Sequence, residues 1–108
     1  MIGDLPTAAI GAMLTDQGWT LSSDGAKATL CLRFANFDAA WSAMERIAAA
    51  ARRLDHHPDW HNVYAMLDIT LTTHDAGCLT ALDLALAAEV HAAAAAHGGV
   101  RDTLTLAT

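Results

Sequence analysis

The sequence predicts an α+β fold in which a four-stranded antiparallel sheet carries three helices on one face. Apolar residues recur at helical spacing in three segments, and stretches that alternate apolar and polar residues stand between them. A short turn joins the first two alternating stretches, as in an antiparallel hairpin. The resulting order of helix, strand, strand, helix, strand, strand and helix is typical of a sheet with its helices gathered on one side.

The first helix is expected over residues 6–17, because Pro6 suits a first helical turn and apolar residues follow at helical spacing. Residues 19–22 can extend after it. Residues 23–25 have the composition of a turn, and residues 29–34 alternate between apolar and polar side chains. These segments predict a hairpin of two antiparallel strands.

The second helix is expected to begin after Asn36, whose side chain can cap it, and to reach about Leu54. Pro58 cannot continue a helix and restricts the residue before it. The helix must therefore end at or before the adjacent residues His56 and His57. The sequence thus places two imidazoles in a loop that follows a helix.

Two further strands are expected over residues 61–65 and 67–74. In the second of them, His74 is expected to end a polar face that alternation assigns to Asp68, Thr70, Thr72 and His74. The opposite face carries Leu67, Ile69, Leu71 and Thr73.

A third helix is expected after Thr80, because Thr80 and Asp83 have the spacing of a capping box. The glycine pair Gly98–Gly99 closes this helix. Residues 100–108 resemble a strand only weakly. They are treated as a C-terminal tail that follows a single domain over residues 1–99.

Composition and charge exclude several classes of function. A single core usually needs on the order of 100 residues, so this chain of 108 residues is expected to form one domain. The net charge of −6 argues against nucleic-acid binding, and the apolar stretches are too short to span a membrane. Cys31 and Cys78 lack a CxxC spacing and no targeting segment is recognisable, so a cytoplasmic protein is expected. An alanine-rich, thin core favours a homo-oligomer.

His56 and His57 are candidate catalytic residues. Imidazole titrates at about pH 6.5, so one ring can donate a proton while another accepts one near neutral pH. The helix end and Pro58 hold both rings in a loop, where catalytic groups tend to lie. Two solvated loop histidines without a function are the alternative interpretation.

A metal site is a second alternative, because His57 and His61 are four residues apart and other histidines could join them. However, Pro58 interrupts any helix that would bring His57 and His61 to one face. Neither Cys nor Glu offers a convincing further ligand. We therefore expect no metal.

Candidate contacts with a substrate also have structural explanations. Asp83 would accept hydrogen bonds within the capping box. Trp60 could be an ordinary core aromatic or one wall of a pocket for a flat ring. Asp55 and Asp59 could orient an imidazole or could be solvated.

Three runs of sequence resemble a known family: LDHHPDWHNVY at residues 54–64, DITLTTHDAG at 68–77 and LTALD at 79–83. In content and spacing they are similar to the signature of the pterin-4a-carbinolamine dehydratases. The resemblance implies a four-stranded antiparallel sheet with three helices on one side, assembled into homodimers or homotetramers. It also implies an enzyme that needs no cofactor.

The resemblance also implies which residues form the site. The catalytic residues would be His56, His57 and His74, and the residues that shape the site or contact the substrate would be Pro58, Trp60 and Asp83. The substrate would be 4a-hydroxytetrahydrobiopterin or a related pterin, the product of an aromatic amino-acid hydroxylase. Its dehydration would yield a quinonoid dihydropterin. Relatives that serve as protein-binding modules are the alternative, but such a role needs no histidine pair.

Overall fold

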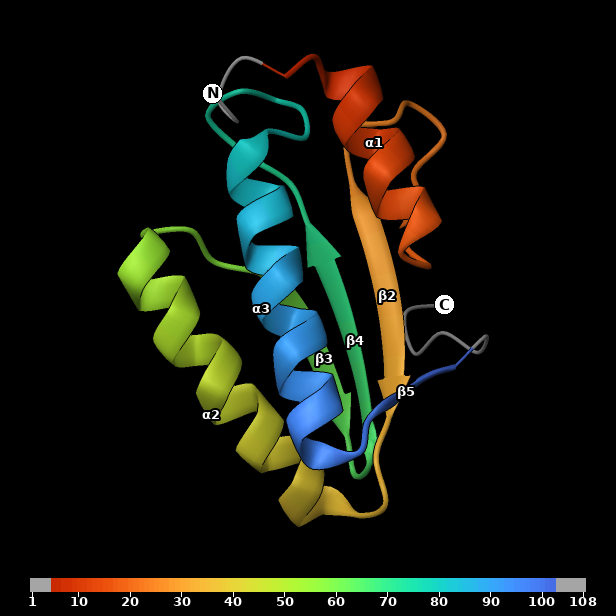
Figure 1. Ribbon diagram of the computed structural model, residues 1–108, viewed down its shortest axis with the longest axis vertical. Coiled ribbons are helices and arrows are strands. Elements are labelled where there is room, and N and C mark those ends of the chain that lie inside the picture. Colours follow the sequence, from red (N-terminus) through yellow and green to blue (C-terminus); the bar gives the residue numbers. More distant parts are fainter. Residues whose placement is uncertain (1–4, 103–108) are drawn as a thin grey trace.

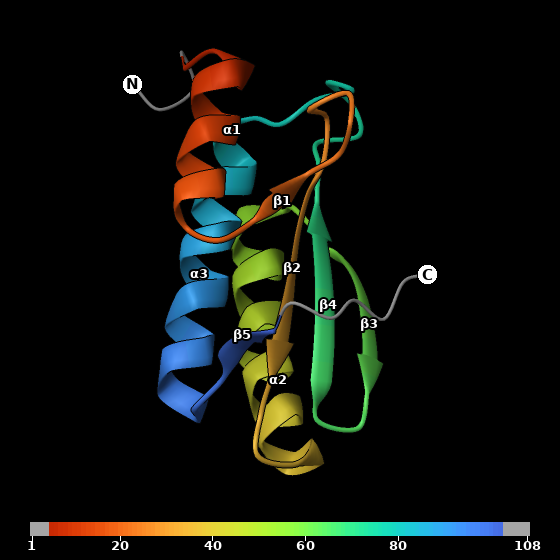
Figure 2. The same cartoon turned by 90° about the vertical axis from the view of Figure 1, so that its right-hand side faces the viewer.

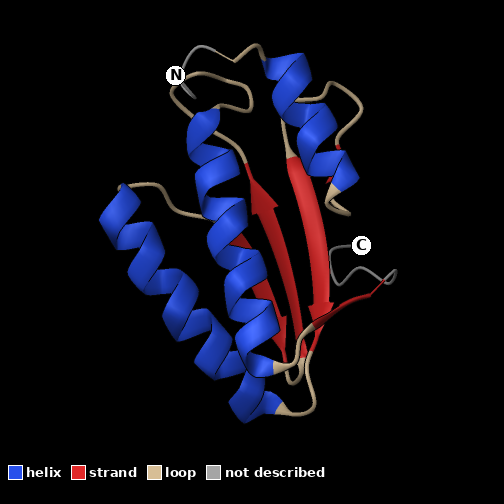
Figure 3. Cartoon of the chain, viewed as in Figure 1, coloured by secondary structure: helices blue, strands red, loops and turns tan. Residues whose placement is uncertain are grey.

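The computed structural model describes residues 5–102, which form three helices and five strands in two layers (Figure 1). The helices are α1 (Thr7–Asp16), α2 (Phe37–Leu54) and α3 (Ala81–His97). The strands are β1 (Thr20–Leu21), β2 (Ala28–Arg33), β3 (Asp59–Val63), β4 (Met66–Leu71) and β5 (Val100–Asp102). The helices cover one face of an antiparallel sheet (Figure 2), and the predicted α+β class is confirmed (Figure 3).

The sheet has one strand more than expected. Its order is β1-β2-β4-β3, and β5 pairs with β2, with Asp102 opposite Cys31. Because β1 pairs with the first two residues of β2, β1 and β5 share one edge of that strand. The sequence does not predict β5, since three residues are too few to show alternation. The rest of the expected tail, residues 103–108, lies outside the described residues.

The core lies between the sheet and the helices α2 and α3. Leu67, Ile69 and Leu71 alternate along β4 and are fully buried. The helices contribute many small side chains to the core, and the buried alanines are Ala40, Ala43, Ala50 and Ala51 in α2 and Ala87, Ala93 and Ala94 in α3. Alanine removes little apolar surface from water but lets two helix axes approach closely. The core is therefore thin and its helices lie close together.

The end of α2 directs the chain into the following loop. Asp55 has a φ of 50° and a ψ of 45°, the left-handed conformation that commonly ends a helix. The backbone N–H of Asp55 donates to the carbonyl of Arg52, and that of His56 donates to the carbonyl of Ala51 at 3.1 Å. This pair of bonds is a Schellman motif, and it confirms the predicted end of the helix at Leu54.

β4 ends at Leu71, before the expected end at His74. Leu71 pairs with Ala28, the first residue of β2, so the sheet offers no partner to the residues that follow. Thr73 instead bridges to Cys78 within the turn that leads to α3. The prediction that His74 ends the polar face of a strand is therefore wrong, because His74 lies in this turn.

The start of α3 confirms the predicted capping box. The Asp83 carboxylate accepts a hydrogen bond from the backbone N–H of Thr80, and the Thr80 side chain caps the first turn. Gly98, with a φ of 73°, ends the helix. Over residues 5–102, no helix is both long and apolar enough to cross a membrane.

Candidate active site

A cleft of 210 Å³ opens where the end of α2, the turn after β4 and the start of α3 come together. Its lining residues are Asp55, His56, His57, Thr72, Thr73, His74, Asp75 and Leu82. The structure therefore brings His56, His57 and His74 to one site, although the last of them lies on a different segment. The Schellman motif at the end of α2 delivers the first two, and the turn beyond β4 delivers the third.

His56 forms a buried pair with Asp83. Nε2 of His56 lies 2.6 Å from Oδ1 of Asp83, and the two residues are 8% and 0% exposed. A buried carboxylate is tolerated only where hydrogen bonds or an opposite charge compensate the lost water. Asp83 is fully buried and does not line the cleft, so it acts on the cleft through the lining residues that it contacts, His56 and Thr73.

Thr73 and Thr80 complete the surroundings of Asp83. The Thr73 hydroxyl donates to Oδ2 of Asp83 at 2.8 Å, and the backbone N–H of Thr80 donates to the same oxygen at 2.8 Å. The hydroxyls of Thr73 and Thr80 lie 2.7 Å apart. Sequence reasoning missed Thr73. The available signal was a hydroxyl on the apolar face of a predicted strand, which needs a hydrogen-bond partner once buried.

His57 and His74 are exposed at the mouth of the cleft. The His74 side chain is 73% exposed, and its Nε2 lies 3.9 Å from Oδ2 of Asp59. Asp55 and Asp75 also line the cleft, so its wall carries carboxylates beside the imidazoles. The cleft thus combines one largely buried imidazole that Asp83 fixes with two exposed imidazoles.

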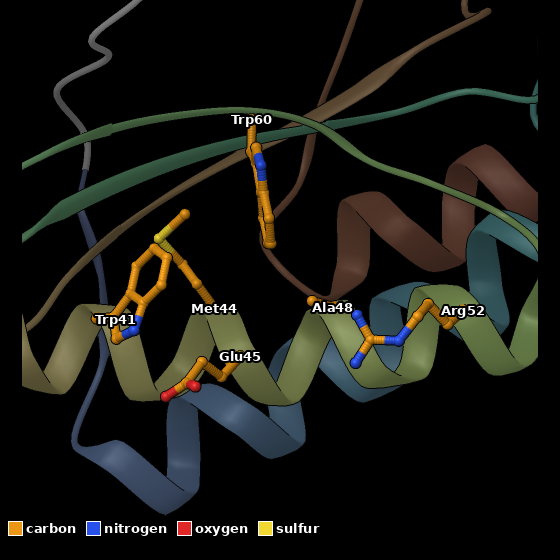
Figure 4. A pocket seen from close by; sticks show the side chains of 6 residues that line it. All are labelled: Trp41, Met44, Glu45, Ala48, Arg52 and Trp60. Carbon is orange, nitrogen blue, oxygen red and sulfur yellow. The ribbon is translucent and has the colours of Figure 1, made fainter.

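The other predicted site residues do not line this cleft. Pro58 follows the histidine pair and joins it to β3, and Asp83 lies behind His56. Trp60 is partly buried and packs against the core from β3. It lines a second groove of 310 Å³ between β3 and α2, with Trp41, Met44, Glu45, Ala48 and Arg52 (Figure 4).

The described residues include no group of three or more His, Cys, Asp or Glu side chains that could hold a metal ion. His56 pairs with Asp83 and His74 lies near Asp59, and each of these pairs includes a single imidazole. The arrangement can donate and accept protons, which is the chemistry of neutral imidazole and imidazolium.

The chain is similar over most of its length to proteins of one family. The family model described as pterin 4 alpha carbinolamine dehydratase matches residues 4–93. A protein of Mesorhizobium japonicum, provisionally named pterin-4-alpha-carbinolamine dehydratase, is 51% identical over 84 residues, which cover 77% of this chain and 86% of the relative. A protein of Rhizobium johnstonii with the same provisional name is 47% identical over 92 residues, covering 84% of this chain and 91% of the relative.

Solved structures share the fold. A transcriptional coactivator/pterin dehydratase from Brucella melitensis has a TM-score of 0.76 and 33% identity, covering 83% of this chain and 97% of that chain. A pterin dehydratase-like protein, identified as a RuBisCO assembly factor in the alpha-carboxysome, has a TM-score of 0.61 at 19% identity. That likeness covers 70% of this chain and 88% of the other, and it is a likeness of fold alone.

Proposed function

The chain belongs to the pterin-4a-carbinolamine dehydratase family, and on that premise we propose that its histidine cleft removes water from a 4a-hydroxytetrahydropterin. The substrate would be 4a-hydroxytetrahydrobiopterin or a close relative. The observation that carries the proposal is the meeting of His56, His57 and His74 at one cleft.

The reaction requires two proton transfers. An acid protonates the C4a hydroxyl as the C4a–O bond breaks, and a base takes the proton from N5 as the C4a–N5 double bond forms. Water and a quinonoid dihydropterin are the products. The base then loses its proton to solvent and the acid regains one, so the protein ends unchanged. Imidazoles suffice for both transfers near neutral pH.

We assign the two proton transfers to His74 and to one of His56 and His57, with the remaining imidazole holding the pterin. Two features of the cleft support this division. His57 and His74 are exposed and can reach a ligand, whereas His56 is fixed by Asp83. Pro58 would shape the loop, and a contact between Trp60 and the pterin stays a prediction.

The test is the rate of 4a-hydroxytetrahydropterin dehydration with and without the protein. We expect His74→Ala to lower the rate by about 10²-fold or more, since general acid–base catalysis contributes that much. We expect His57→Ala to lower it as well. His97→Ala, at the end of α3 and outside the cleft lining, is the matched control. A wild-type rate equal to the uncatalysed rate would exclude the enzyme. Full activity in both cleft variants would exclude the residue assignment.

We also propose that the protein forms a homo-oligomer. It would act in the cytoplasm, on the product of an aromatic amino-acid hydroxylase. Phe37 and Trp41 support association, because their rings stack on the surface of α2 with centroids 6.1 Å apart and both residues are exposed. Large exposed aromatics are common at interfaces between chains. The molecular mass measured by light scattering tests the oligomeric state. A monomeric mass at micromolar concentration would exclude the oligomer.

A protein-binding role without catalysis is the second candidate function. The fold it shares with a RuBisCO assembly factor favours this alternative, together with the exposed aromatic pair on α2. The dehydration assay distinguishes the two, because a binding module would leave the uncatalysed rate unchanged.

A further inference from the structure

Both oxygens of the Asp83 carboxylate accept hydrogen bonds from the protein. Oδ1 meets Nε2 of His56 at 2.6 Å, while Oδ2 accepts from the Thr80 backbone N–H and from the Thr73 hydroxyl, each at 2.8 Å. The carboxylate is fully buried, so water does not compete for these bonds. An ionised carboxylate only accepts hydrogen bonds. His56 must therefore donate from Nε2.

The hydroxyl protons around Asp83 can be placed as well. Thr73 gives its single hydroxyl proton to Asp83, so the hydroxyl of Thr80 must donate in the bond of 2.7 Å between the two threonines. The Thr80 oxygen in turn accepts from the backbone N–H of Leu82 at 3.3 Å. The bonds thus run in one direction, from the first turn of α3 through Thr73 to Asp83. The two bonds donated to Oδ2 favour the ionised carboxylate, which has no proton to donate to His56.

We propose that the Thr80–Thr73–Asp83 network fixes His56 as the Nε2–H tautomer, so that its Nδ1 is the proton acceptor of the cleft. Nδ1 makes no hydrogen bond within residues 5–102, and His56 lines the cleft. Thr73 and Asp83 are then positioning residues that act through His56. The assignment of Nδ1 as acceptor rests on the proposed dehydration, whereas the tautomer does not.

The acceptor role follows from the same bonds. Nδ1 of His56 takes the N5 proton of the pterin while the C4a hydroxyl leaves as water with a proton from an exposed histidine. The imidazolium that forms keeps its Nε2–H bond to the buried Asp83 carboxylate, which compensates the new charge. Because both nitrogens of His56 are then protonated, it must release a proton to solvent before the next turnover.

Nitrogen-15 NMR of the histidine side chains tests the tautomer without any assay of activity. We expect neutral His56 to carry its proton on Nε2 in the wild-type protein. In Asp83→Asn the amide oxygen can still accept from Thr73 and Thr80, but its NH₂ group faces His56 Nε2 and needs an acceptor. The proton should then move to Nδ1. An Nδ1–H tautomer in the wild type, or an unchanged tautomer in Asp83→Asn, would overturn the proposal.

The kinetic consequence is a loss in kcat with little change in KM. We expect a drop of roughly 10³-fold in Asp83→Asn, because an imidazole held in the wrong tautomer cannot accept the proton. If the wild-type protein shows the Nε2–H tautomer but no dehydratase activity, the proposed function fails and the tautomer assignment stands. The two measurements therefore test the tautomer assignment and the proposed dehydration separately.

Thr73 is tested by a pair of substitutions. Thr73→Val removes the hydroxyl at nearly constant shape and should lower kcat about tenfold, the usual effect of losing one hydrogen bond to a charged group. Thr73→Ser keeps the hydroxyl and should restore most of the rate. Thr29→Val is the matched control, because Thr29 and Thr70 form a similar hydroxyl pair at 2.9 Å outside the cleft lining. Equal rates in Thr73→Val and Thr29→Val, or no recovery in Thr73→Ser, would contradict the positioning role.

Discussion

Trp19 donates its indole N–H to Nε2 of His91 at 2.9 Å, and the two rings meet edge to face with centroids 5.9 Å apart. Trp19 is almost fully buried, so this bond satisfies a donor that has no access to water. His91 can accept only while Nε2 is unprotonated. Burial lowers the pKa of His91 below its usual value of 6.5, which keeps the ring neutral in the folded protein.

The pKa of His91 predicts a loss of stability in mild acid. The unfolded chain binds the proton more readily than the folded one, so the contribution of His91 is complete above pH 6.5 and is lost as the pH falls through the lowered pKa. His91→Gln keeps an acceptor for Trp19 and cannot titrate. We expect its free energy of unfolding to fall less than that of the wild type between about pH 7.5 and about pH 5 in urea titrations. Equal losses in the two proteins would refute the prediction.

Asp59 should matter little to catalysis although it lies beside His74. Both side chains are mostly exposed, and Nε2 of His74 lies 3.9 Å from Oδ2 of Asp59. Exposed ion pairs contribute little because water and salt screen them, so Asp59→Asn should change kcat/KM by less than about threefold. Measurement at low and high salt checks this. A loss as large as that in Asp83→Asn would show that Asp59 orients His74 directly.

Gly99 should not tolerate a side chain. A Cβ at this position would lie 2.5 Å from Cε2 of Phe34, whose ring is buried and cannot withdraw freely. Gly99→Ala should therefore lower the free energy of unfolding by about 3 kcal/mol. Gly98→Ala is the control, because nothing lies within 4 Å of its Cβ and only the positive φ of 73° opposes it, at a cost of about 1 kcal/mol. Urea unfolding in which Gly98→Ala is the more damaging change would contradict the predicted clash.

Adjacent residues of α1 should differ sharply in their contribution to stability. Leu14 is fully buried in the core, whereas Met13 is 43% exposed. Leu14→Ala should cost about 3 kcal/mol through lost burial and the cavity left behind, and Met13→Ala less than about 1 kcal/mol. Thermal and urea unfolding of the two variants check this. Similar losses would mean that α1 does not pack as described.

Features that depend on local chemistry could be predicted from the sequence. The capping box of Thr80 and Asp83 and the end of α2 before Pro58 involve residues within one turn of one another, and both are present. The end of β4 could not be predicted, because it depends on where β2 begins. The pairing of β5 depends likewise on a distant strand.

In the candidate site, too, some residues could be predicted from the local sequence and others could not. His56 and His57 could be singled out because Pro58 fixes their surroundings locally, and the family resemblance added His74. The role of Thr73 could not be predicted, since its partner Asp83 lies on another element. The groove that Trp60 lines could not be predicted either. Alternation along a strand does not tell which groove a partly buried side chain will line, and this one faces α2 (Figure 4).

The groups at the cleft come from places where regular structure stops: the end of α2, the turn after β4 and the start of α3. None of His56, His57 and His74 contributes to the hydrogen-bond ladder of the sheet. Replacement of the exposed His57 and His74 therefore leaves the scaffold intact, and a descendant could lose the chemistry and keep its shape. Asp83 is the exception, because the same carboxylate caps α3 and holds His56. A lineage released from catalysis should retain an acidic or amide side chain at position 83 longer than it retains the imidazoles.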